Sequence, residues 1–184
     1  TEPYQSLLPL EQAVQVWLDQ PIGELAYPIS PEGKLDAALY GSQVAALFNQ
    51  VQLAETGADF SCTSLGNDPV VLEVTEEVLR QTLERCAAYF TLVDGQPQIS
   101  EEFLLPKVEH YNYDFYAGLA YTFDLRRPVG SRVVRLTKLD GSPLENGKFR
   151  LCTSNYRATG TGGYDALRKC PVLWRGGVEM PDLT

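Results

Sequence analysis

The stretch that most constrains this chain is residues 154–164, which read Ser-Asn-Tyr-Arg-Ala-Thr-Gly-Thr-Gly-Gly-Tyr and contain three glycines. Because glycine has no Cβ, it adopts positive φ angles and lets the backbone approach a bound group closely. This density of glycine predicts a loop. The loop carries an aromatic ring at Tyr156, and such a ring can stack on a nucleobase, which is worth about 1–3 kcal/mol. The stretch therefore favours a ligand with a planar ring.

The sequence offers few groups that could catalyse a reaction. Its one histidine, His110, lies in a polar segment, and no nucleophile elbow occurs in the chain. A two-metal phosphatase needs several histidine and carboxylate ligands, and a Ser-His-Asp hydrolase needs its histidine beside a nucleophile. We therefore expect no catalytic residue and no metal ligand in this chain, and a structural or solvent-exposed His110.

The cysteines show neither the spacing of a metal site nor the density of a disulfide framework. There are four, far apart and without a Cys-x-x-Cys pair: Cys62, Cys86, Cys152 and Cys170. Cys86 falls on the apolar side of a predicted helix, where we expect a buried free thiol.

Length and charge bound the class of protein. A chain of 184 residues fits a single domain over 1–184 with a substantial core. The net charge of −9 argues against a nucleic-acid polymer as partner, because phosphate backbones are bound by clustered lysines and arginines. No apolar run reaches the roughly 20 residues of a membrane span. The first residues, Thr-Glu-Pro, lead us to expect a domain excised from a longer protein.

Apolar spacing predicts an α+β fold, with a mixed β-sheet flanked by helices and no clean βαβ repeat. Helices are expected over 7–18 and 36–52, with a short one over 165–169. A further helix is expected to start at Thr75 as N-cap and to bury a face that consists of Val78, Leu79, Leu83, Cys86, Ala87 and Phe90. Turns are expected at Asp94-Gly95 and Asp140-Gly141, and 97–114 is expected to be rich in loops. The expected strands are 58–63, 70–74, 119–125, 132–139 and 149–153.

Segments spaced along nearly the whole chain carry a family resemblance. They are 17–23, 56–59, 83–90, 111–114, 127–133 and 155–164, the last beginning Asn-Tyr-Arg-Ala-Thr-Gly. Together they resemble the C-terminal domain of the 5′-nucleotidase family, and within it most closely the bacterial 2′,3′-cyclic-nucleotide 2′-phosphodiesterase/3′-nucleotidase branch. Agreement of several spaced segments is more specific than one glycine loop.

The resemblance implies a division of labour. An N-terminal metallophosphatase domain of the same polypeptide, absent from this chain, would hold two divalent metal ions and hydrolyse the substrate. The C-terminal domain would need no cofactor and would bind the nucleoside between two aromatic rings. Tyr156 matches the second of these rings, and the glycines match the turn beside it. The candidate substrate-binding residues are Tyr156, Asn155, Arg157, Gly160, Gly162, Gly163, Tyr113 and Asp114.

Each of these assignments has an alternative. An aromatic residue at the end of a strand, such as Tyr156, commonly belongs to the core. Arg157 either holds a phosphate or pairs with an acidic residue at the surface. The aromatic segment 111–116 either faces the nucleotide cleft or covers the core.

The chain also departs from the family pattern. The Gly-Gly-Gly-Ile-Arg motif of true 5′-nucleotidases is missing, no arginine precedes Arg80, and Gly162 stands where some members have an acidic residue. The family inserts a longer segment, with the first stacking ring, between the strands that here end near Thr63 and begin near Val70. Either the domain lacks this half of the clamp, or a loop within 64–69 is missing from this sequence. We expect the second.

The leading interpretation is the substrate-recognition domain of a secreted, extracytoplasmic two-metal hydrolase of nucleoside 2′,3′-cyclic or 3′-phosphates. The chain alone is expected to be inactive, because it lacks metal ligands. One alternative is a catalytically silent binding or cell-surface module. Another is a domain of a 5′-nucleotidase or a nucleotide-sugar hydrolase.

Overall fold

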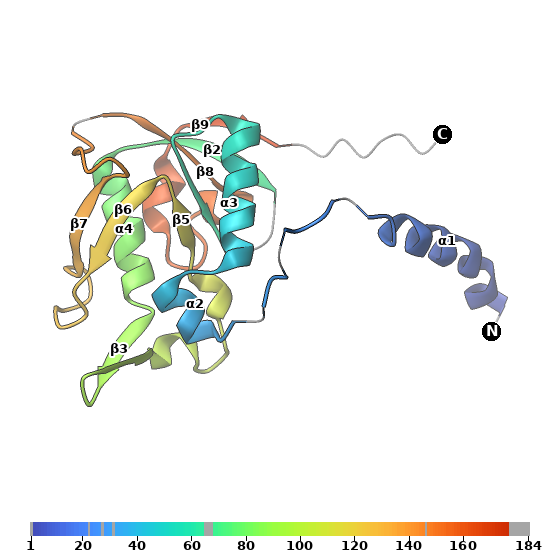
Figure 1. Cartoon of the computed structure of the whole chain (residues 1–184), viewed down its shortest axis with the longest axis horizontal. Helices are drawn as coiled ribbons and strands as arrows, with labels where there is room; N and C mark the ends of the chain where they lie inside the picture. The colour runs from blue at the N-terminus through green and yellow to red at the C-terminus, as the bar shows by residue number, and fades with distance from the viewer. Residues whose placement is uncertain are drawn as a thin grey trace. The chain divides into compact units, whose positions relative to one another are not determined.

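The computed structural model describes residues 2–21, 23–26, 28–30, 32–64, 68–145 and 147–176. The chain divides into two compact units, Thr1–Ser30 and Pro31–Thr184, and the prediction of one domain over 1–184 stays a prediction. The first unit holds α1 (Glu2–Leu18), which confirms the helix predicted over 7–18 and begins earlier (Figure 1). None of the described helices is both long and apolar enough to span a bilayer.

The helix predicted over 36–52 is two helices, α2 (Lys34–Tyr40) and α3 (Gln43–Thr56). The break lies at Gly41, whose φ of +97° lies outside the range of a right-handed helix. Ser42 then caps α3, because its hydroxyl accepts a hydrogen bond from the Ala45 N–H at 3.3 Å. The prediction of one continuous helix was wrong because helical apolar spacing continues on both sides of Gly41 and Ser42, where the backbone leaves the helix.

The buried side of α3 does not follow its large apolar residues. Asn49 is buried and donates to the main-chain oxygen of Phe115 at 2.9 Å, while its Oδ1 accepts from the Ser61 hydroxyl at 2.8 Å. Three large apolar residues of the helix are exposed instead: Leu47, Phe48 and Val51. Polar contacts with the sheet, rather than the apolar stripe, set the rotation of this helix.

A five-stranded mixed sheet forms the centre of the second unit and confirms the α+β prediction. Its order is β5-β1-β8-β2-β9, with β1 parallel to β8 and the other neighbours antiparallel. The strands are β1 (Phe60–Thr63), β2 (Pro69–Val74), β5 (Phe115–Ala117), β8 (Phe149–Ser154) and β9 (Val172–Arg175). The three inner strands match the predicted ones, and the two edge strands were not predicted.

The helix α4 (Glu76–Ala87) confirms its prediction most closely. The Thr75 hydroxyl accepts from the Val78 N–H at 3.4 Å, and Leu79, Leu83 and Cys86 are buried. These side chains share one core with Cys62 and Leu72 of the sheet. Since neighbouring strand residues point to opposite faces, Ser61 and Cys62 place α3 and α4 on opposite sides of the sheet (Figure 1).

Two hairpins and three short 3₁₀ helices complete the unit. Phe90 was predicted on α4 but begins β3, because the helix ends at Ala87. The predicted turn at Asp94-Gly95 joins β3 to β4, with φ of +51° and +75°. The predicted turn at Asp140-Gly141 follows β7, with φ of +85° at Gly141. The elements are β3 (Phe90–Val93), β4 (Gln96–Ile99), β6 (Leu119–Phe123), β7 (Val133–Lys138), η1 (Glu101–Phe103), η2 (His110–Asn112) and η3 (Asp165–Lys169).

The topology brings three chain segments to one edge of the sheet. Parallel β1 and β8 both end there, and antiparallel β2 begins there with Pro69 opposite Ser154. The connection from β1 to β2 therefore crosses the carboxyl end of β8. At its far side, Asp68 accepts from the Asn155 main-chain N–H at 2.8 Å and from its side-chain amide at 3.1 Å. The loop predicted to be missing lies within 64–69, of which 65–67 lie outside the described residues.

The thiols give a first test of this core. All four cysteines are free, and three are buried. Burial, with a smaller contribution from Asp114, raises the pKa of Cys86 to about 12, and burial also raises the pKa of Cys62. Because the thiolate is the reactive species, we expect Cys62, Cys86 and Cys152 to react with Ellman's reagent at least about 100-fold slower in the folded chain than in urea.

The half-exposed Cys170 is the internal reference for this measurement. The Cys170→Ser variant should have no fast-reacting thiol in the folded state and three in urea. Rapid stoichiometric labelling of the folded Cys170→Ser variant would contradict the described core.

Candidate functional site

Tyr156 and Arg157 lie in the turn that follows β8 and differ sharply in exposure. The loop predicted over 154–164 begins with one helical turn, α5 (Asn155–Ala158), started by the Ser154 hydroxyl, which accepts from the Arg157 N–H at 3.2 Å. Tyr156 is 36% exposed, whereas Arg157 is 1% exposed. A single turn at the end of β8 thus presents an aromatic ring to solvent and sends a guanidinium into the core.

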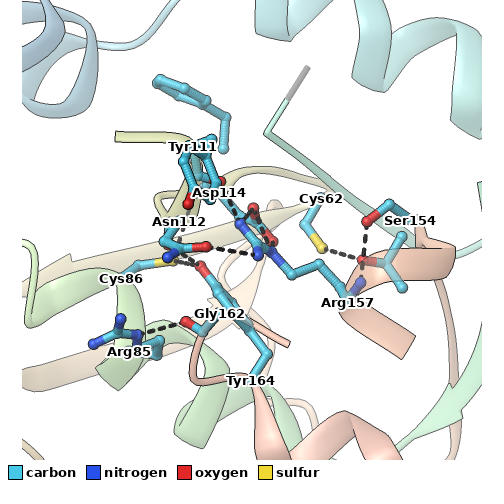
Figure 2. Close-up of polar contacts among 12 residues, drawn as sticks. Cys62, Arg85, Cys86, Tyr111, Asn112, Asp114, Ser154, Arg157, Gly162 and Tyr164 are labelled. Atoms are coloured by element: carbon cyan, nitrogen blue, oxygen red, sulfur yellow. Dashed lines mark hydrogen bonds and ion pairs between the residues drawn. The ribbon is translucent and has the colours of Figure 1, made fainter. Parts of the chain in front are cut away.

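Arg157 uses its whole guanidinium inside the protein (Figure 2). Its Nε donates to both oxygens of Asp114 at 3.0 Å, and Nη2 donates to Asp114 Oδ1 at 2.9 Å. Nη2 also donates to the Tyr111 main-chain oxygen at 2.5 Å. Nη1 donates to Asn112 Oδ1 at 3.2 Å and to the Thr161 main-chain oxygen at 3.3 Å. A guanidinium has five N–H donors, so none is left for a phosphate.

The two alternatives for Arg157 were a phosphate ligand and a surface ion pair. The structure shows a buried ion pair instead, with Asp114 0% exposed. Burial raises the pKa of Asp114, and the facing guanidinium opposes that effect by stabilising the carboxylate. The guanidinium carbon also lies 4.3 Å from the ring centroid of Tyr164 and 5.4 Å from that of Tyr156. The exposed ring of Tyr156 therefore rests on a buried cation.

Tyr113 and Asp114 do not line an open cleft beside Tyr156. Tyr113 is buried in the core, where its hydroxyl donates to the main-chain oxygen of Ala38 at 3.0 Å and its ring contacts Tyr89. Segment 111–116 was expected either to face the nucleotide or to cover the core. Tyr113 belongs to the core, and Asp114 is buried in the ion pair with Arg157. The expectation that both face the nucleotide is not supported by this placement.

The three glycines of the turn let its backbone lie close to neighbouring side chains. Gly160, Gly162 and Gly163 have φ of +82°, +80° and +88°, in the region that was predicted for them. A Cβ on Gly162 would overlap Arg157 Nη1 and Asn112 Oδ1, and one on Gly163 would overlap Arg85 Nε. The turn thus lies directly against the ion pair.

Several residues that hold the site were not predicted. Arg85 on α4 donates from Nε to the Gly162 main-chain oxygen at 2.8 Å and pairs with Glu102 at 2.5 Å. The Tyr164 hydroxyl donates to the Asn112 main-chain oxygen at 3.1 Å and lies 3.2 Å from the Cys86 sulfur. Tyr164 was noticed only as the aromatic that closes the glycine loop. No local pattern marks Arg85 or Asn112, because their partners are distant in sequence.

Catalytic groups are not assembled here among the residues that the structure describes. No group of three or more histidine, cysteine, aspartate or glutamate side chains could hold a metal ion in that part of the chain. His110 is half-buried, and its Nδ1 lies 2.8 Å from the Tyr89 hydroxyl, which is a structural role. The arrangement can present the ring of Tyr156 for stacking.

Comparison with known proteins decides the family. The pattern of the family described as 5′-nucleotidase, C-terminal domain, matches residues 60–169, more than half of the chain. The chain belongs to this family. The match runs from β1 to the end of η3 and so contains the ion pair, the glycine turn and Tyr156.

Two curated relatives are nucleotide phosphoesterases. The trifunctional nucleotide phosphoesterase protein YfkN of Bacillus subtilis is 25% identical over 126 residues, which are 61% of this chain and 8% of that protein. The 2′,3′-cyclic-nucleotide 2′-phosphodiesterase/3′-nucleotidase of Haemophilus influenzae is 31% identical over 108 residues, 51% of this chain and 16% of that protein. The chain therefore spans less than a fifth of each relative.

A solved structure supports the fold. A Staphylococcus aureus protein, described as a candidate 5′-nucleotidase in complex with alpha-ketoglutarate, superposes with a TM-score of 0.82 at 28% identity. The superposition covers 91% of this chain and 37% of that one. The mixed sheet with flanking helices is thus the fold of this family's C-terminal domain.

Breaking the buried ion pair should destabilise the domain strongly. Arg157→Met leaves a buried carboxylate without its counter-charge, and we expect the free energy of unfolding to fall by about 3–5 kcal/mol in urea titrations. The control is Arg126→Met, since the Arg126 side chain is 83% exposed in its pair with Asp124. That variant should lose no more than about 1 kcal/mol.

The deficit of Arg157→Met should also depend on pH. Without the guanidinium, the pKa of the folded Asp114 carboxyl rises further above its unfolded value, so the folded variant takes up a proton that the unfolded chain does not. The deficit should therefore shrink as pH falls from about 7 to about 5. A loss under about 1 kcal/mol, or one that grows on acidification, would contradict the described pair.

The glycine turn can be tested with a matched pair of alanine variants. Gly141→Ala places a Cβ at φ +85° with nothing within 4 Å, so it carries only the backbone cost of about 1–2 kcal/mol. Gly162→Ala has φ +80° and adds the overlap with Arg157 and Asn112. We expect it to lower the free energy of unfolding measurably more than Gly141→Ala. Equal losses would mean that the turn does not press on the ion pair.

Proposed function

We propose that this chain is the nucleotide-recognition domain of a hydrolase that acts on nucleoside 2′,3′-cyclic and 3′-phosphates. Family membership supports nucleotide chemistry, and the 31% identity to a 2′,3′-cyclic-nucleotide 2′-phosphodiesterase/3′-nucleotidase supports this branch. The absent arginine before position 80 and the missing Gly-Gly-Gly-Ile-Arg motif favour the same branch over true 5′-nucleotidases.

The observation that carries the proposal is the exposed ring of Tyr156 at the carboxyl end of β8. Its backbone belongs to a turn whose next residue is locked in the core by five donors, so the ring is held in place before a ligand binds. A preorganised ring loses little entropy on stacking. Asn155 and the glycines of the turn would lie beside the bound nucleoside, while Arg157 positions Tyr156.

In this proposal the reaction occurs elsewhere in the parent protein. An N-terminal metallophosphatase domain of the same polypeptide would hold two divalent metal ions, which polarise the phosphoryl group and activate a water molecule. The recognition domain would bind the base and deliver the phosphate to that centre. We place the parent protein outside the cytoplasm, in the periplasm, the cell wall or the medium, on the family resemblance.

A second candidate function is a silent binding or cell-surface module with this fold. The short connection across β8 favours it, because residues 64–68 read Ser-Leu-Gly-Asn-Asp and supply no aromatic ring. A domain of a 5′-nucleotidase or a nucleotide-sugar hydrolase is the third, and the similarity to a candidate 5′-nucleotidase of Staphylococcus aureus favours it. Stacking alone does not separate bases or phosphate positions, since every base has a π-face.

Titration of the chain with 3′-AMP and 2′,3′-cyclic AMP, followed by NMR chemical shifts, tests the proposal. We expect saturable binding by the wild type and a loss of affinity of at least about fivefold in Tyr156→Ala, from the removed stacking contact. Tyr40→Ala, which removes an exposed ring from α2, is the control and should bind like the wild type. The chain alone should release no phosphate with added divalent metal.

Each outcome has a defined meaning. Absence of binding by the folded wild type would contradict a recognition role for this chain and favour the silent module. Binding that survives Tyr156→Ala would remove Tyr156 from the site. Metal-dependent phosphate release by the pure chain would overturn the division of labour.

A further inference from the structure

Asn155, the residue directly before Tyr156, is attached by two hydrogen bonds to the end of the connection from β1 to β2. Its main-chain N–H donates to the Asp68 main-chain oxygen at 2.8 Å, and its side-chain Nδ2 donates to Asp68 Oδ2 at 3.1 Å. The residues next to this pair, Pro69 and Ser154, are partners in the sheet. Asp68 and Asn155 are therefore held together through both backbone and side chain.

The contact with Asp68 fixes which way the Asn155 amide faces. An ionised carboxylate has no proton and only accepts hydrogen bonds, whereas an amide has an NH₂ group that donates and an oxygen that accepts. A reversed amide would place its Oδ1 against Asp68 Oδ2, and two acceptors repel each other. The amide nitrogen of Asn155 therefore faces Asp68, and Oδ1 is turned away from it.

The Asn155 amide keeps a donor and an acceptor for another group. One of its two N–H bonds is directed to Asp68, and Oδ1 accepts no hydrogen bond from any residue that the structure describes. Asp68 is exposed and Asn155 is half-buried, so a ligand can reach this pair. Within the described ranges, no lysine or arginine forms an ion pair with Asp68. The pair thus suits a ligand that donates hydrogen bonds, and not a phosphate.

The ring of Tyr156 brings a stacked base next to this amide. The Cα atoms of Asn155 and Tyr156 are about 3.8 Å apart, as in any trans peptide. The turn is fixed on one side through Arg157 and on the other through Asp68, so the ring and the amide are presented together. Asparagine binds adenine by accepting from its N6 amino group and donating to the neighbouring ring nitrogen. The free groups of Asn155 are this acceptor and this donor.

We propose that Asn155 selects adenine, and that Asp68 is a positioning residue that keeps the Asn155 amide turned for this selection. The inference rests on the proposed function, because the base in question is the one stacked on Tyr156. Adenine and hypoxanthine both offer a face for stacking, but at C6 adenine has an amino group and hypoxanthine has an oxygen. Oδ1 accepts from the amino group and repels the oxygen, and Asp68 prevents the amide from reversing. The selectivity therefore requires both residues.

Titration of the whole chain with 3′-AMP and 3′-IMP, followed by NMR chemical shifts, tests the inference. The two ligands have the same sugar and phosphate, so the ratio of their affinities reports on the base. We expect the wild type to bind 3′-AMP at least about fivefold more tightly than 3′-IMP, because a bidentate contact distinguishes bases by at least this factor. Asn155→Ala should reduce the ratio to below about twofold, since both ligands then keep only the stacking contact.

The positioning role is tested by Asp68→Asn. An amide at position 68 can meet either end of the Asn155 amide, so Asn155 can reverse and the ratio should fall to below about twofold. A partial loss of folded protein affects both ligands equally and leaves the ratio unchanged. The matched control is Asp140→Asn, because Asp140 is an exposed aspartate that accepts from the Ser142 N–H at 2.9 Å. That variant should keep the wild-type ratio.

The outcomes separate this inference from the proposed function. If the wild type binds both nucleotides equally, or prefers 3′-IMP, the inference is overturned and the proposed function stands. A wild-type ratio in Asn155→Ala also overturns it, and a wild-type ratio in Asp68→Asn overturns the positioning role of Asp68. If the folded wild type binds neither nucleotide, the proposed function itself fails.

Discussion

The ion pair between Arg157 and Asp114 is the constraint on which the rest of this domain's surface depends. Moving both charges out of water is costly, and the attraction between them compensates only if the remaining donors are also satisfied. That requirement recruits Tyr111, Asn112 and Thr161, whose oxygens accept the other guanidinium protons. A segment before β5 and the turn after β8 are thereby held at one edge of the sheet.

This arrangement explains why the glycines are needed where they are. The guanidinium lies 4.3 Å and 5.4 Å from two tyrosine ring centroids, and a Cβ on Gly162 would overlap its Nη1. The backbone of the turn approaches there, and Arg85 secures it from α4 through the Gly162 oxygen. Glycine density, which predicted a loop, here also indicates a turn that packs closely against buried side chains.

The features that could be predicted are those determined by residues close together in the sequence. The helix α4 has its cap at Thr75 and its buried face within twelve residues, and the inner strands have compact apolar runs. The edge strands β9 and β5 were missed although their residues are mostly apolar, because three or four residues show no repeating pattern. The break between α2 and α3 was missed because Gly41 and Ser42 act through backbone angles.

The role of Arg157 could not be predicted for a related reason. Its partner Asp114 lies 43 residues away, and nothing local distinguishes an arginine that enters the core from one that meets a phosphate. The neighbouring Tyr156 was predicted at the surface because glycines follow it, and its exposure agrees. The proposed function was therefore easier to infer from family resemblance than from any single charged residue. The role of a charged residue such as Arg157 depends on its partner, which the sequence does not reveal.

The crossing from β1 to β2 has a consequence for how such domains vary. Both of its ends are fixed by strands that flank β8, and the entropy of closing a loop grows only by about 0.6 kcal/mol for each doubling of its length. Residues added between Thr63 and Pro69 would cost little stability and would join the sheet at the edge where Asp68 contacts Asn155. A connection that tolerates insertions thus belongs to the same sheet edge as the candidate site, and a change in its length would alter that edge while the core stays the same.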